Sequence, residues 1–220
     1  MKTKYPRTFH LPYSLTITED DKRLPSDDQF KGTMVVMLEK MDGENSSVYP
    51  NGIIHSRSID GQSMPWQSWL RKNVAQWAHN IPENWRVCGE NLYAKHSIEY
   101  LFDKQSQYFQ VFSIWDQDIC LPWAETEEWC QLLDIEHVPV IYSGIYKDQD
   151  AILKIFNEYQ KEKNSQGQEV EGFVVRNIDK FRLEDFSSNV AKYVRANHVQ
   201  TDEHWTEHWT INPCKKQKGA

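Results

Sequence analysis

Short apolar runs separated by turn residues recur along this chain of 220 residues. The run at residues 34–38 is too short for a helix and is typical of a buried strand. Similar runs predict further strands at residues 53–58, 85–88, 108–116, 171–176 and 189–195. Apolar side chains at helical spacing predict helices over residues 63–79, around residues 129–133 and over residues 152–159. The pattern therefore predicts a mixed fold of strands and helices.

Polar stretches separate these elements. Residues 1–31 hold a basic opening, an acidic run and a proline, and they predict a loop-rich lead-in. Residues 161–169 are polar throughout and predict a flexible loop. Residues 200–220 predict a short C-terminal helix followed by a basic tail.

Composition fits a folded protein, because 39% of the residues are hydrophobic and 13% are aromatic. The length suffices for one well-buried domain, which is the simplest organisation. No apolar run reaches the length of a membrane span, and the first thirty residues lack the apolar core of a signal peptide. We therefore expect a cytoplasmic protein with no membrane partner.

Charge and cysteine usage narrow the possible partners. The formal net charge of -7 gives no overall attraction for nucleic acid, so such a partner would need a local basic patch or metal ions. The cysteines form no Cys-x-x-Cys pair, which argues against a disulfide framework and against a ribbon-type zinc site. They are Cys88, Cys120, Cys130 and Cys214. We expect reduced thiols.

Lys40 is the first candidate for chemistry, because it ends the apolar run and is followed by the turn signal Asp42-Gly43. An unperturbed lysine, with a pKa of about 10.4, is neutral only about once in a thousand molecules near pH 7. A nucleophilic Lys40 therefore needs a metal ion, further cations or burial to lower its pKa. We also expect a hairpin between this strand and residues 53–58, which would place Arg57 near Lys40. The competing interpretation is a surface lysine at a hairpin turn.

Several stretches, in this order along the chain, resemble the motifs of the covalent nucleotidyltransferase superfamily, which contains ATP-dependent DNA and RNA ligases and mRNA capping enzymes. The stretches are Lys40-x-Asp42-Gly43, Arg57, Gly89-Glu90, the Phe112 strand, the run from Glu171 to Val175, and Lys192. Within this superfamily the chain is most similar to the RNA ligases. That similarity rests on residues 39–45, 55–58 and 89–98.

The resemblance implies an α+β fold, in which mainly antiparallel sheets flanked by helices hold the nucleotide between them. It covers residues 32–199, which we expect to form the nucleotidyltransferase domain. Only 25 residues follow Arg195, too few for the additional C-terminal domain of many ligases. We therefore expect a nearly bare catalytic domain.

The resemblance also implies an activity. Lys40 would attack the α-phosphorus of ATP, expel pyrophosphate and carry AMP, which then activates RNA for joining 5′-phosphate and 3′-hydroxyl ends. The implied roles are sugar contact for Arg57, ribose contact for Glu90, adenine stacking for Phe112, Mg²⁺ or Mn²⁺ binding for Glu171, and α-phosphate contact for Lys192. Further nucleotide contacts are expected from Glu39, Met41, Asn45, Phe173 and Arg195. Phe109 competes with Phe112 for stacking. Arg195 stands near where the family commonly has a second lysine, and the sequence leaves open whether it acts as that second cation.

Other functions remain open from the sequence. A DNA ligase and a GTP-using guanylyltransferase belong to the same superfamily. A zinc-binding structural module is an alternative of another class, and its ligands would be His198, His204, His208 and Cys214. An amphipathic tail helix with solvated histidines explains the same residues more simply. A nucleotide-binding protein without catalysis is disfavoured by the intact Lys40.

Overall fold

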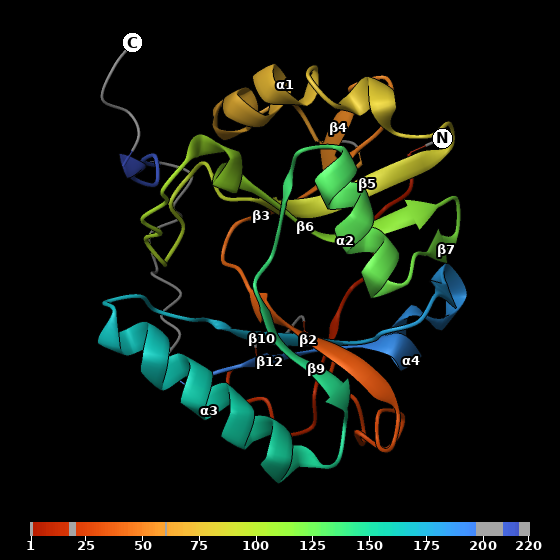
Figure 1. Cartoon of the computed structure of the whole chain (residues 1–220), viewed down its shortest axis with the longest axis vertical. Helices are drawn as coiled ribbons and strands as arrows, with labels where there is room; N and C mark the ends of the chain where they lie inside the picture. Colours follow the sequence, from red (N-terminus) through yellow and green to blue (C-terminus); the bar gives the residue numbers. More distant parts are fainter. Residues whose placement is uncertain (1, 18–20, 60, 197–208, 216–220) are drawn as a thin grey trace. The chain divides into compact units, whose positions relative to one another are not determined.

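The computed structural model describes residues 2–17, 21–59, 61–196 and 209–215 (Figure 1). The chain forms two compact units, and neither unit is a single stretch of sequence. The Lys40 unit comprises Pro6–Met41 and Pro139–Val199. The Glu90 unit comprises Met1–Tyr5, Asp42–Val138 and Gln200–Ala220.

The Lys40 unit is built on one sheet with the strand order β1-β12-β10-β2-β9. Its strands are β1 (Phe9–His10), β2 (Met34–Lys40), β9 (Val140–Ile145), β10 (Gly172–Asn177) and β12 (Val190–Val194). All neighbouring strands are antiparallel except β1, which runs parallel to β12. The unit also contains β11 (Phe181–Arg182), the 3-10 turn η4 (Leu183–Asp185), α3 (Gln149–Ser165) and α4 (Phe186–Asn189).

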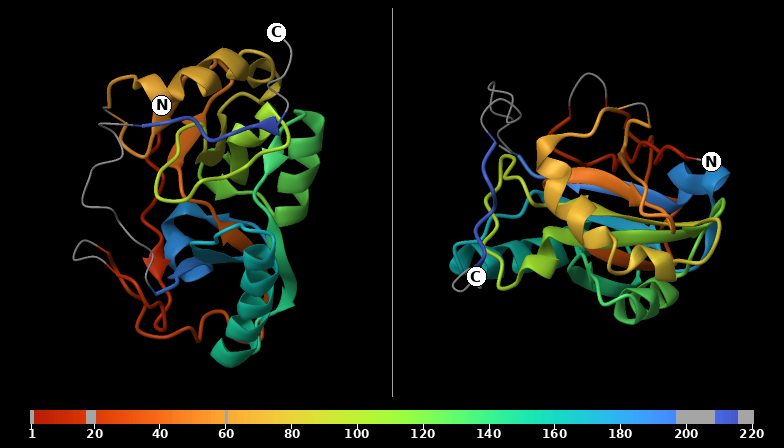
Figure 2. Two further views of the ribbon diagram at one scale, coloured as in Figure 1. Left: turned by 90° about the vertical axis from the view of Figure 1, so that its left-hand side faces the viewer. Right: turned by 90° about the horizontal axis from the view of Figure 1, so that it is seen from above.

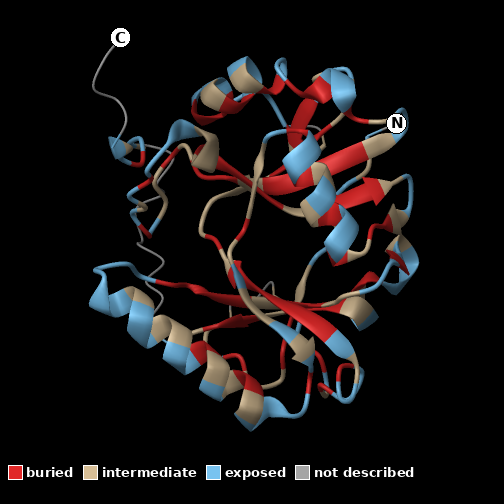
Figure 3. Ribbon diagram, in the orientation of Figure 1, coloured by how far each residue is buried: buried red, intermediate tan, exposed pale blue. Residues whose placement is uncertain are grey.

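Strand β2 is buried along almost its whole length, as the apolar run predicted (Figure 3). Helix α3 packs on one face of the sheet (Figures 1 and 2), where Phe156 contacts Phe173 and Tyr193 at ring-centroid distances of 5.1 and 5.5 Å. The side chain of Asp148 caps this helix by accepting a hydrogen bond from Ala151 N at 2.8 Å. The sheet and α3 together hold β2 in place, and with it the lysine at its end.

Gly172 is required at the start of β10, because a Cβ atom there would lie 1.9 Å from the carbonyl oxygen of Tyr193 on β12. We therefore expect Gly172→Ala to lower the free energy of unfolding by about 3 kcal/mol, since backbone atoms would have to move to relieve the overlap. Urea denaturation measures this loss. Gly61→Ala is the control, because its nearest neighbour is Ser58 O at 3.7 Å. Equal stability of the two variants would contradict the expectation.

The Glu90 unit holds a second sheet, in which the strand order is β7-β6-β5-β3-β4 and β8 pairs with β6. Its strands are β3 (Glu44–Val48), β4 (Ile54–Ser56), β5 (Trp85–Asn91), β6 (Phe109–Asp116), β7 (Ile119–Cys120) and β8 (Glu136–His137). Helices α1 (Ser68–Val74) and α2 (Trp123–Leu132) contribute Leu70, Val74 and Cys130 to a core with Val87 and Ile114. The described part of the unit also holds the short 3-10 turns η1 (Pro65–Gln67), η2 (Ala78–Asn80) and η3 (Gln105–Tyr108).

Three sequence predictions about the fold are wrong. The strand β4 pairs with β3 rather than with β2, so the expected hairpin with the Lys40 strand does not form. Helix α3 continues to Ser165, into the segment that we expected to be a flexible loop. The helix expected over residues 63–79 is broken into η1, α1 and η2.

Further features of the described residues concern the lead-in, the cysteines and the C-terminal segment. The lead-in is mostly loop, with only the short β1 in its described part. The four cysteines are free, as expected. No helix in the described ranges is long and apolar enough to cross a membrane. The expected C-terminal helix falls largely on residues 197–208, which lie outside the described residues.

Candidate active site

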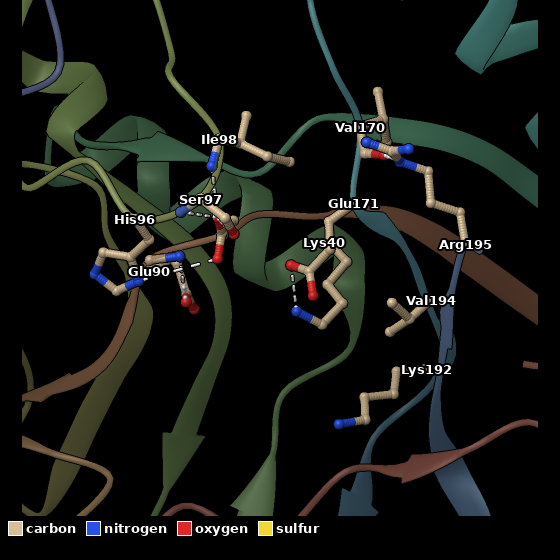
Figure 4. Close-up of polar contacts among 12 residues, drawn as sticks. Lys40, Glu90, His96, Ser97, Ile98, Val170, Glu171, Lys192, Val194 and Arg195 are labelled. Carbon is tan, nitrogen blue, oxygen red and sulfur yellow. Dashed lines mark hydrogen bonds and ion pairs between the residues drawn. The ribbon is translucent and has the colours of Figure 1, made fainter. Parts of the chain in front are cut away.

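Lys40 is the last residue of β2, and its cross-strand neighbour on β10 is Gly172. Its Nζ donates a hydrogen bond to Glu171 Oε2 at 2.5 Å (Figure 4). The Glu171 side chain is only 8% exposed and that of Lys40 is 22% exposed. The structure therefore brings together the predicted nucleophile and the predicted metal ligand, which are 131 residues apart in sequence.

Lys192 lies on the same face of the sheet as Lys40. The cross-strand neighbour of Lys192 is Val174, and that of Val174 is Leu38 on β2. Leu38 lies two residues before Lys40, and side chains two residues apart on a strand share a face. Burial lowers the pKa of Lys192, the ion pair with Asp21 opposes this shift, and the charge of Lys40 adds to it. The Asp21 carboxylate lies 2.9 Å from Lys192 Nζ. Two lysines thus share one face, each with its own carboxylate partner.

Asp21 and His10, both in the lead-in, were not predicted as site residues from the sequence. His10 is buried, its Nδ1 lies 2.7 Å from Ser14 Oγ, and its Nε2 lies 3.2 Å from Asp21 Oδ2. Burial lowers the pKa of His10 to about 4, so this ring is neutral near pH 7. The acidic run of the lead-in signalled a carboxylate, but nothing in its spacing indicated which one reaches Lys192.

Glu39 and Phe173 face away from Lys40. The two residues are cross-strand neighbours, and both lie on the face that α3 covers. Tyr159 of α3 donates a hydrogen bond to Glu39 Oε2 at 2.5 Å, and burial raises the pKa of this carboxyl. The structure therefore does not bring these two side chains together with Lys40. Met41, the next residue, is 7% exposed.

Arg195 follows β12 and is engaged with the segment that leads into β10. Its Nε donates to Val170 O at 2.7 Å (Figure 4), and its Nη2 lies 2.7 Å from Glu169 Oε2. Its backbone N donates to Glu171 O at 3.1 Å. Arg195 thus holds the backbone that carries Glu171, and its predicted nucleotide contact stays a prediction.

The turn after Lys40 is anchored inside the Glu90 unit. Asp42 Oδ2 accepts hydrogen bonds from Ser97 N, Ser97 Oγ and Ile98 N at 2.9, 2.6 and 2.8 Å. Gly43 N donates to Glu90 Oε1 at 3.2 Å. A Cβ on Gly43 would lie 2.6 Å from Asn91 O, so glycine lets this turn pass close to β5. The Asp-Gly turn of the Lys-x-Asp-Gly sequence is therefore fixed by the loop that carries Ser97 and Ile98 and by Glu90 on β5.

The predicted nucleoside contacts of this unit lie on or beside its sheet. Asn45 is the cross-strand neighbour of Glu90, and its Oδ1 is buried without a hydrogen-bond donor among the described residues. Phe112 is half-buried against Tyr5, with ring centroids 5.1 Å apart. Phe109 instead stacks on Trp77 inside the core, so only Phe112 of the two candidate rings is exposed enough to stack on a base. Arg57 is exposed, just after β4.

A carboxylate such as that of Glu171 suits a hard cation that takes its remaining oxygen ligands from water and substrate. No group of three His, Cys, Asp or Glu side chains in the described ranges is placed to hold a metal ion by itself. Mg²⁺ commonly uses one or two carboxylates together with water and substrate phosphates, and the buried Glu171 carboxylate fits that use. Of the zinc alternative's ligands, the three histidines lie outside the described residues.

Comparison with solved structures identifies the fold. An archaeal ATP-dependent RNA ligase (form 1) is 16% identical, with a TM-score of 0.56 over 87% of this chain and 48% of that chain. Naegleria gruberi RNA ligase with PPi is 16% identical, with a TM-score of 0.52 over 88% of this chain and 61% of that chain. A mutant of the Naegleria enzyme, with ATP and Mn, is 14% identical, with a TM-score of 0.52 over 87% of this chain and 60% of that chain. The α+β fold is that of the ligase nucleotidyltransferase domain.

The RNA ligase family model matches residues 33–194, well over half of the chain. The chain belongs to the RNA ligase family. It spans roughly half to three fifths of the length of the ligases to which it is similar, at 48%, 60% and 61%. No curated protein sequence matches it significantly.

Proposed function

We propose that the chain is an ATP-dependent RNA ligase, which joins 5′-phosphate and 3′-hydroxyl ends through a covalent lysyl-AMP intermediate. The observation that carries this proposal is the position of Lys40, at the end of a buried strand within the RNA ligase family match and in hydrogen-bond contact with Glu171. A lysine fixed in this way has a defined direction of attack, because the sheet leaves its side chain few alternatives.

In the first step, Lys40 Nζ would form a bond to the α-phosphorus of ATP while the bond to the pyrophosphate oxygen breaks. The amine must give up a proton, and Glu171 Oε2 is placed to accept a hydrogen bond from it. Lys192 would donate to the nonbridging α-phosphate oxygens, where charge accumulates in the transition state. AMP would then pass to the 5′-phosphate of RNA, and the 3′-hydroxyl would displace it.

Glu171 would hold the divalent cation, whose charge stabilises the phosphate oxygens and favours the neutral form of a nearby amine. The fit rests on the carboxylate itself, which is buried and forms an ion pair with Lys40. The Naegleria ligase structure with ATP and Mn supports this choice of co-substrate and metal class. Magnesium and manganese are both suitable ions.

Residues of the Glu90 unit would hold the nucleoside. Asn45 Oδ1 needs a donor, which a bound nucleotide would supply. Phe112 would stack on adenine, an interaction worth about 1–3 kcal/mol per base. Glu90 would accept a hydrogen bond from the ribose, and Arg57 would contact the sugar.

The test is covalent labelling of the purified chain with each of the four α-labelled nucleotides in the presence of Mg²⁺ or Mn²⁺. We expect label transfer from ATP, followed by sealing of RNA with 5′-phosphate and 3′-hydroxyl ends. Transfer from GTP alone would favour a guanylyltransferase, and sealing only of nicked DNA would favour a DNA ligase. No transfer from any nucleotide would refute the proposal.

Asp21 gives this reaction a predicted pH dependence. Its negative charge opposes the lowering of the Lys192 pKa, so Asp21→Asn should lower that pKa further. Lys192 would then lose its charge at a lower pH, and the alkaline limb of the adenylylation profile should move toward neutral pH.

The initial rate of label transfer between pH 6 and pH 10 measures this shift. Asp28→Asn is the matched control, because Asp28 is exposed and pairs with Lys31. An alkaline limb that is the same in Asp21→Asn and in the wild type would show that Asp21 does not govern Lys192.

A further inference from the structure

Residues 209–215 form backbone hydrogen bonds with the loop that follows β5. Lys95 N donates to Thr210 O, Asn212 N to Tyr93 O, Phe102 N to Pro213 O and Lys215 N to Phe102 O, at distances of 2.8 to 3.0 Å. Figure 2 shows this segment, in deep blue, beside the yellow-green loop. We call residues 209–215 the strap. The strap is an integral part of the Glu90 unit.

Asn212 is the buried centre of the strap, with an exposed fraction of 0%. Its Oδ1 accepts from Tyr100 N at 2.9 Å, and its Nδ2 donates to Leu92 O at 2.8 Å and to Ala94 O at 3.3 Å. Its backbone oxygen accepts from the hydroxyl of Tyr108 at 2.8 Å. One amide side chain thus joins both ends of the loop 92–100.

That loop in turn fixes the turn after Lys40. Tyr100 Oη accepts a hydrogen bond from Asp42 N at 2.8 Å, while Ser97 and Ile98 donate to the Asp42 carboxylate. The Tyr100 ring is itself held by stacking on Phe102, at 5.7 Å and 17°. An unbroken series of contacts therefore leads from Asn212 through Tyr100 to Asp42, two residues after Lys40.

We propose that Asn212 is a positioning residue for lysine adenylylation, because it holds the loop 92–100 in the conformation that anchors Asp42. This inference rests on the proposed function. Buried hydrogen bonds to backbone groups fix a loop more strictly than apolar contact does. A shift of the loop would leave buried donors and acceptors without partners, and each of these would cost free energy. A small displacement of a reacting group slows its reaction steeply.

The experiment is a double-mutant cycle on the wild-type chain with Asn212→Ala and Tyr100→Phe. Tyr100→Phe removes the hydroxyl that accepts from Asp42 N and keeps the ring. Each single variant is expected to slow Lys40-AMP formation at saturating ATP about tenfold. Because both changes act on the same anchor, the double variant should be slowed about tenfold as well. A hundredfold loss in the double variant, the product of independent effects, would overturn the proposal.

Two further variants separate positioning from general destabilisation. Lys215→Ala removes an exposed strap contact, to Asp103 at 2.9 Å, and should leave the rate unchanged. Asn212→Ser fits within the same space, and its hydroxyl can both donate and accept. It should restore part of the rate, and it replaces Asn212→Ala in the cycle if that variant does not fold. A rate in Asn212→Ser that is no higher than in a folded Asn212→Ala would count against the proposal.

Amide hydrogen exchange tests the same coupling without activity. Asn212→Ala should speed exchange at Asp42, Ser97 and Ile98 about tenfold, while the amides of β6 keep their protection. Unchanged exchange at Asp42 would refute the positioning role even if the enzyme is active. A wild type that forms no lysyl-AMP would refute the proposed function instead, and the exchange result would still decide the role of Asn212.

Discussion

Lys40→Ala is expected to abolish the covalent AMP adduct, with a loss of label transfer of at least about a thousandfold. Lys40→Arg should fail equally, because a guanidinium is not deprotonated in proteins and is therefore no nucleophile. Both variants should fold, since Lys40 ends its strand and its side chain is partly exposed. The measurement is transfer of α-labelled AMP to the protein, together with the mass of the intact chain.

Lys154→Ala is the control for this experiment, because Lys154 is exposed on α3. A preadenylylated RNA strand bypasses the lysine adduct, so the Lys40→Ala variant should still seal it. An adduct of undiminished yield on either Lys40 variant would remove Lys40 from its assigned role.

Glu171→Ala is expected to lower the rate of adenylylation by about a hundredfold or more, because it removes both the proposed metal ligand and the hydrogen-bond partner of Lys40. The affinity for ATP should change less, since the nucleoside contacts are made by other residues. Titration of Mg²⁺ in the label-transfer assay should show a much higher metal requirement than in the wild type.

Glu171→Gln separates the two roles of this carboxylate. The amide oxygen can still accept from Lys40 Nζ, but it is a weaker ligand for a hard cation. Glu158→Gln on the exposed side of α3 is the matched control. An unchanged Mg²⁺ requirement in Glu171→Gln and in Glu171→Ala would show that the metal is held elsewhere.

The strands that the sequence predicted best are those buried on both faces. β2 and β10 carry continuous apolar runs, and β12 is apolar on both sides of Lys192; such runs are a strong local signal. β3 was missed because its sequence, Glu-Asn-Ser-Ser-Val, holds a single apolar residue. Because β3 was not predicted, β2 was the nearest predicted strand to β4 in the sequence. This omission produced the wrong hairpin prediction.

The site was predictable only where a motif or an alternation rule applied. Lys40 was first indicated by its place at the end of an apolar run, whereas Glu171 came from the family resemblance, since no local pattern connects residues so far apart. Strand alternation implies that Glu39 and Lys40 face opposite sides of the sheet, as the structure shows, and the nucleotide contact expected of Glu39 stays a prediction. Asp21 was beyond prediction because β1 pairs in parallel with β12, and no short-range signal reports a parallel pair.

The path of the chain between β2 and β9 has a consequence for the evolution of this protein. These two strands are antiparallel neighbours, and Glu39 N donates to Pro139 O at 2.8 Å, so Asp42–Val138 is inserted where a hairpin turn would otherwise suffice. An insertion whose two ends leave adjacent backbone positions can be exchanged without opening the host sheet. Under the proposed function, nucleotide preference lies in the inserted segment and phosphate chemistry in the host sheet, so the two can diversify separately by replacement of the inserted segment around a constant lysine and its carboxylate.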